Sequence, residues 1–137
     1  MNELNLWALE FEDTVFSLFS YAYNKKFKKK YKDLYITQDE EQDGTAIFPT
    51  VLVKQIDLRE VGKDISGNTI NGIDSTFQVT ISYKGDRENL KELSNYAVMF
   101  FKSKRFGVSS VFYNISNKIR TATFRASRVV GANDTLV

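Results

Sequence analysis

The side chains that most often carry out chemistry in proteins are sparse in this sequence. The 137 residues contain no histidine and no cysteine. The chain therefore lacks the groups of Ser-His and Cys-His nucleophile systems, and the two ligand types that zinc sites use most. Carboxylates and lysines remain as groups that could act as an acid, a base or a nucleophile.

Carboxylates gather in two stretches, and neither has the spacing of a known site. The first, Asp39 to Asp43, lacks the alternating Asp/Asn pattern and the distal glutamate of a calcium loop. The second stretch holds Asp57, Glu60, Asp64 and Asp74. These four have no partner at a fixed spacing, and no glycine-rich phosphate loop precedes a helix. We therefore expect no enzyme activity, no metal and no cofactor.

Length and composition indicate one ordinary domain, residues 1–137, with a core of its own. No apolar run approaches the roughly 20 residues that cross a bilayer, and acidic residues interrupt any signal-peptide core near the N-terminus. The formal net charge of +2 is too small to indicate nucleic acid or a membrane as a partner. The absence of cysteine fits a reducing compartment.

Two stretches have the periodicity of amphipathic helices. From about Leu4 to Lys29, apolar residues recur every three or four positions and form a broad stripe. Asp86 to Lys104 has a similar stripe, with Asp86 placed to cap the helix and Gly107 placed to end it. We expect both stripes to be buried.

A lysine cluster, Lys25 to Lys32, closes the first helix and has two interpretations. Lysines interleaved with aromatic residues can follow a phosphate backbone. Cations at the carboxyl end of a helix also interact favourably with its dipole. Acidic residues follow almost at once, so we favour the second interpretation and expect no specific nucleic-acid binding.

The clearest strand is Ser75–Tyr83, where apolar and polar residues alternate strictly. Leu34–Thr37 predicts a short strand. Phe48–Ile56 predicts another that is apolar enough to be covered on both faces. Later in the chain, Val108–Ile115 and Ile119–Val130 predict a hairpin that turns at Asn117-Lys118.

These elements predict an α+β fold, in which two helices pack on one face of a mixed or antiparallel sheet. The other face of the sheet should be polar and nearly free of lysine and glutamate, which suits a contact with another protein or a wet lumen. Its expected members are Thr76, Gln78, Thr80, Thr121, Thr123 and Arg125.

Residues 57–74 form the longest polar stretch, yet they keep spaced isoleucine and valine residues. We interpret the stretch as a long β-hairpin arm that reaches a neighbouring subunit. Val61 and Ile65 should dock there. Polar contacts at the rim should come from Arg59, Glu60, Lys63 and Asp64.

Residues 131–137 follow the last strand as a tail. Arg128 has the phase of the buried Phe124, but it lies near the strand end, where a bulge could turn it outward. We expect it to make a subunit contact with Asp134 of a neighbouring tail.

Five short segments follow one another in this order of elements: Phe48-Pro49-Thr50-Val51, Ile70-Asn71-Gly72, Ser75-Thr76-Phe77-Gln78-Val79, Arg105-Phe106 and Arg128-Val129-Val130-Gly131. With the elements around them, these segments resemble the tail terminator proteins of long-tailed bacteriophages and prophages. The resemblance covers about Phe48 to Leu136, and the first helix matches in type. The lysine-rich end of that helix is not part of the family pattern.

The resemblance implies a small structural subunit whose hexameric ring caps the tail tube beneath the head connector. Its partners would be other copies of itself, the tail tube protein and head connector proteins. The ring would be assembled in the host cytoplasm and would lie at the head–tail junction of the virion. Two alternatives stay open: another connector or tail-completion subunit, and a lone α+β module that binds a peptide at a sheet edge.

Overall fold

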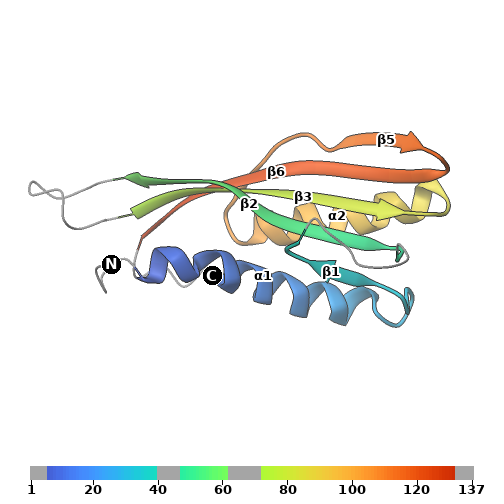
Figure 1. The fold of residues 1–137 in the computed structure, drawn as a ribbon, viewed down its shortest axis with the longest axis horizontal. Coiled ribbons are helices and arrows are strands. Elements are labelled where there is room, and N and C mark those ends of the chain that lie inside the picture. The colour runs from blue at the N-terminus through green and yellow to red at the C-terminus, as the bar shows by residue number, and fades with distance from the viewer. Residues whose placement is uncertain (1–5, 40–46, 62–71, 132–137) are drawn as a thin grey trace, which may run out of the picture.

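The computed structural model describes residues 6–39, 47–61 and 72–131, which form a two-layer α+β structure (Figure 1). These residues make two helices and six strands. In chain order they are α1 (Leu6–Phe27), β1 (Tyr35–Thr37), β2 (Thr50–Val61), β3 (Gly72–Tyr83), α2 (Arg87–Ser103), β4 (Gly107–Val108), β5 (Phe112–Ser116) and β6 (Ile119–Gly131).

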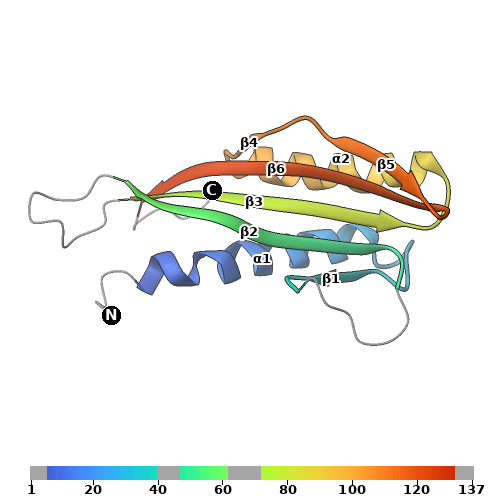
Figure 2. The same cartoon turned by 45° about the horizontal axis from the view of Figure 1, so that its top comes forward.

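The sheet is mixed, and its strand order is β1-β2-β3-β6-β4, with β5 also paired to β6. β1 lies parallel to β2, and all other pairs are antiparallel. The three long strands β2, β3 and β6 form its centre. Both helices lie on the same side of this sheet (Figure 2). The predicted fold class is therefore confirmed.

The described part of the polar stretch 57–74 is a hairpin, as expected. β2 and β3 stay paired as far as Val61 and Gly72, with a bulge between Gln55 and Asp57. The stretch thus begins and ends as an extension of two central strands (Figure 1). Residues 62–71 lie outside the described residues.

Helix α1 buries a narrower stripe than the sequence indicated. Every fourth residue is buried, in the row Phe11, Val15, Phe19, Tyr23 and Phe27. Leu18, an apolar residue of the expected stripe, is exposed, because it lies about 100° around the helix from the neighbouring buried Phe19. The Tyr23 hydroxyl donates a hydrogen bond of 2.9 Å to the carbonyl of Leu93, which ties α1 to α2.

Aromatic rings fill the space between the helices and the sheet. Phe101 of α2 lies at their centre, with ring centroids 5.1–6.2 Å from those of its aromatic neighbours. Such pairs stabilise beyond the area that they bury, by roughly 0.5–1.5 kcal/mol each. The neighbours are Phe19, Phe77, Phe100, Phe106 and Phe124.

The end of α2 differs from the prediction. Gly107 was expected to end the helix, but the left-handed residue that ends it is Arg105, at φ 67°. The amide of Phe106 donates to the carbonyl of Phe101, and the amide of Arg105 donates to that of Lys102, the two bonds of a Schellman motif. The Phe101–Phe106 ring contact offsets the conformational cost at Arg105. Gly107 begins β4 instead.

Two strand predictions need correction. The expected strand Val108–Ile115 is interrupted between β4 and β5. There the backbone amide of Arg125 donates its hydrogen bond to the Ser109 hydroxyl and not to a backbone carbonyl of a neighbouring strand. The strand β2 is covered on one face only, because both helices lie on the same side. Val51 and Val53 are buried there, whereas Leu52 on the other face is half-buried.

The hairpin at Asn117-Lys118 is confirmed. Both residues have positive φ, 51° and 67°, and Ser116 pairs with Ile119 on either side. A two-residue turn with both φ positive matches the twist of the strands that it joins.

Candidate functional site: the open face of the sheet

The face of the sheet opposite the helices is covered by neither helix (Figure 2). The predicted members of the polar face on β3 and β6 lie directly opposite one another. The pairs are Thr76 with Ser127, Gln78 with Arg125, Thr80 with Thr123, and Ser82 with Thr121. The structure therefore brings together all six residues that the sequence placed on this face.

Contacts between these side chains hold the face in place. The hydroxyls of Thr76 and Ser127 lie 2.9 Å apart, and the Nε of Arg125 donates to Oε1 of Gln78 over 3.3 Å. Arg125 is exposed, while Gln78 and the threonines of β3 are half-buried. These contacts order the part of the face that β3 and β6 form, where Arg125 is the one charged side chain; β2 adds Lys54 opposite Gln78.

The same face continues onto the start of the arm. Arg59 of β2 lies opposite Asp74 of β3, with Nη2 3.1 Å from the Asp74 carboxylate, and its Nε lies 3.3 Å from that of Asp57. These groups are largely exposed, so the ion pairs contribute at most about 1 kcal/mol. Arg59 is thus paired within its own chain, and its role at a subunit contact stays a prediction.

The other predicted interface residues are described only in part. Glu60 and Val61 form backbone pairs with Ile73 and Gly72. Lys63, Asp64, Ile65 and Asp134 lie outside the described residues.

Arg128 does not turn outward. The β3–β6 register is continuous through it, so the bulge that the sequence left open is absent and the side chain keeps the phase of Phe124. Its Nη1 donates a hydrogen bond to the carbonyl of Lys104, the residue that caps α2. Arg128 therefore joins the last long strand to the end of α2, and its proposed contact with Asp134 of a neighbour stays a prediction.

The lysine cluster is partly engaged within the chain. The Nζ of Lys28 donates to the carbonyl of Leu34, and the Nζ of Lys30 lies 2.9 Å from the Glu92 carboxylate. The hydrogen bond with Glu92 raises the pKa of Lys30. Lys25 and Lys26 occupy the last turn of α1, where their positive charges interact favourably with the helix dipole. These contacts fit the structural interpretation of the cluster.

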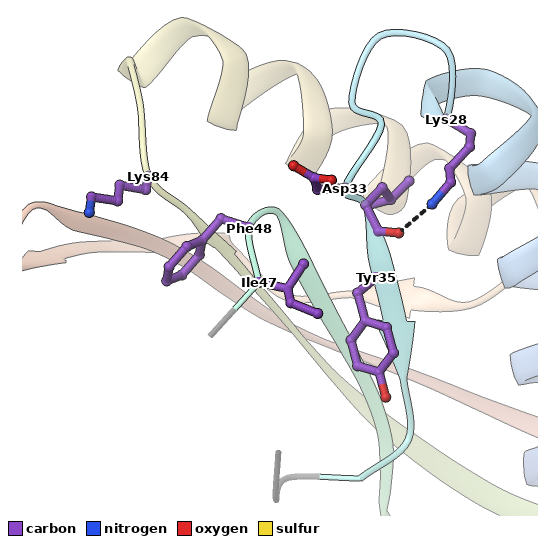
Figure 3. Close-up of a pocket in the computed structure, with 7 residues that line it drawn as sticks. Lys28, Asp33, Tyr35, Ile47, Phe48 and Lys84 are labelled. Atoms are coloured by element: carbon purple, nitrogen blue, oxygen red, sulfur yellow. Dashed lines mark hydrogen bonds between the residues drawn. The ribbon is translucent and has the colours of Figure 1, made fainter. Parts of the chain in front are cut away.

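A hollow of about 620 Å³ lies beside this cluster and was not foreseen from the sequence (Figure 3). Lys28 points to the carbonyl of Leu34, and Lys84 points away from that hydrogen bond (Figure 3). Among the described residues that line the hollow, no side chain that could act as a nucleophile is hydrogen-bonded to a base. Its lining residues are Lys28, Asp33, Leu34, Tyr35, Ile47, Phe48 and Lys84.

In residues 6–39, 47–61 and 72–131, no group of three or more acidic side chains is placed to hold a metal ion. None of the helices in the described part of the chain is long and apolar enough to cross a membrane.

Comparison with known proteins gave no relative: neither the protein-family models nor the curated proteins include a match to this chain. Function must therefore be argued from the geometry of the surfaces.

Proposed function

We propose that this protein is a structural subunit, a tail terminator of a long-tailed bacteriophage or prophage. Its ring would cap the tail tube, stop the tube from growing and offer a joining surface to the head connector. The observation that supports this most is the open face of the sheet, where β3 and β6 present four cross-strand pairs of polar side chains in which Arg125 is the one charged member.

The chemistry of this face suits the lumen of such a ring. A genome that passes through a ring must not be held by it, and grip on a phosphate backbone comes chiefly from lysine and arginine. The central pairs of β3 and β6 contain one cation, Arg125, whose Nε is already engaged by Gln78. Hydroxyl and amide groups keep the face wet without fixing DNA.

A ring also explains how a small subunit could cap a tube without chemistry. Each copy needs only a modest contact with the tube protein, because a closed ring adds the contacts of all its subunits.

A second candidate is a lone module that binds a peptide at a sheet edge. The observation that favours it is the edge strand β5, where all five residues are exposed. Another connector or tail-completion subunit would share the surfaces described above.

The ring itself can be tested on the purified full chain. Native mass spectrometry and negative-stain microscopy over a range of concentrations should show a closed assembly, with six copies as the expected number. Symmetric closure should make this species appear without a ladder of open intermediates. A monomer at every concentration, with no ring on any grid, would favour the lone module instead.

A further inference from the structure

Strand β5 forms an edge that is unusually apolar for its exposure. It pairs with β6 on one side, and no other described strand pairs with it. Phe112 is 75% exposed and Ile115 is 55% exposed. Free edges with apolar side chains are ready to pair with another chain, and proteins that remain monomers usually protect them with charge or proline.

The helix side of this edge is basic. Arg87, at the start of α2, and Arg120, at the start of β6, line a hollow of about 290 Å³ together with Leu90 and Ile115. The Tyr113 hydroxyl lies 2.9 Å from that of Ser94 on α2, which fixes the strand against the helix. The edge thus combines apolar side chains with two guanidinium groups.

The opposite edge of the sheet has the complementary character. β1 covers the outer side of β2 only at residues 50–52, and Ile56 and Leu58 beyond it are exposed. Glu12 of α1 accepts a hydrogen bond of 3.0 Å from the amide of Gln55, which holds the helix against this edge. A further acidic residue of α1, Asp13, is exposed next to Glu12, and its Oδ1 accepts a hydrogen bond of 3.2 Å from the side-chain amide of Gln38, just past β1.

We infer that the β5 edge of one subunit binds the acidic β2–α1 edge of the next copy of this chain. This inference rests on the proposed ring and names the contact that would build it. The two edges lie on opposite sides of the sheet (Figure 1), so the contact is head to tail and can close into a ring.

Strand directions and charge both favour this pairing. β5 runs antiparallel to β6, β6 to β3, and β3 to β2, so β5 is antiparallel to β2. Equivalent neighbours therefore meet as an antiparallel pair. Two β5 edges meeting each other would instead bring Arg87 and Arg120 of both copies together, where like charges repel.

The stagger of the two edges sets the tilt of the subunit. β5 lies near the end of the sheet where β2 begins, whereas the free stretch of β2 lies toward the arm (Figure 1). The two can meet in a ring only if the strands are inclined to the ring axis, as they are in closed sheets.

The absence of cysteine allows a direct test by cross-linking. Leu58 and Ile115 lie on the helix side of their strands, on opposite edges of one subunit. The double variant Leu58→Cys/Ile115→Cys, treated with a short bis-maleimide, should give a ladder of covalent oligomers up to the full ring. A control pair, Met99→Cys/Ile115→Cys, uses an exposed residue of α2 and should stay monomeric.

Charge exchange gives an independent measurement. Arg87→Glu should raise the concentration for half-assembly at least tenfold, while the fold is kept because an acidic residue suits the first turn of a helix. Adding Asp13→Lys in the same chain should restore most of the loss. If the parent protein forms rings but the Leu58→Cys/Ile115→Cys variant gives no ladder of cross-linked oligomers, this contact is refuted and the proposed function is not. Dimers from Ile115→Cys alone would also refute it. A parent protein that never assembles would refute both.

Discussion

Replacing Phe101 with alanine is expected to lower the free energy of unfolding by about 4 kcal/mol. The ring is buried at the centre of the aromatic core. It contacts Phe19 of α1, one phenylalanine on each of β3 and β6, and Phe106 just beyond the end of α2. A domain of this size has roughly 5–15 kcal/mol of total stability, so the variant should be close to unfolding. Urea titration followed by circular dichroism measures the loss.

The matched control is Met99→Ala, two residues earlier on the same helix. Met99 is 61% exposed, so its truncation should change stability by less than about 0.5 kcal/mol. Equal losses in the two variants would mean that α2 does not face the sheet with Phe101.

Replacing Asp64–Asn68 with a Gly-Ser linker of the same length should abolish the ring and leave the subunit folded. The predicted docking residue Ile65 is lost, while the β2–β3 ladder to Val61 and Gly72 is kept. A replacement of equal length, confined to the segment between two paired strands, leaves the entropy of chain closure nearly unchanged. Native mass spectrometry reports the ring, and thermal melting reports the fold.

A second variant tests whether assembly depends on the side chains of Asp64 and Ile65 or on any change in this segment. Changing only Ser66 and Asn68 to glycine leaves Asp64 and Ile65 in place, so the ring should persist. If assembly survives the full replacement unchanged, the arm is not part of the subunit contact.

Local pattern was enough to predict most of the fold. The strict alternation of Ser75–Tyr83 gave the phase of β3, and the same argument on the last strand gave Thr121, Thr123 and Arg125 as its open-face residues. Phase within a strand depends only on the pleat. The open face could therefore be assembled before the register between the strands was known.

Tertiary contacts decided what the sequence could not. Arg105 ends α2 because Phe106 packs on Phe101, a contact that spacing does not reveal, and glycine is the residue usually expected there. The phase of Arg128 was visible, but the carbonyl of Lys104 that it contacts comes from a different element. The hairpin β5–β6 was predicted, but the exposure of its outer strand depends on where the sheet stops.

The position of charge around the sheet edges likewise required the structure. Glu12, Asp13 and Arg87 are ordinary helix residues in the sequence. Only the packing of α1 beside β2, and of α2 beside β5, places acidic and basic groups at opposite edges. The head-to-tail contact proposed above could not have been inferred from spacing alone.

The most direct test of the central claim is tail length in a phage or prophage that lacks this subunit. After deletion of the coding sequence, electron microscopy of induced lysates should show tails longer than the normal length, mostly without heads, because nothing stops the tube or joins it to the connector. Supplying the intact chain from a plasmid should restore both features. Tails of normal length attached to heads in the deletion strain would contradict the proposed function.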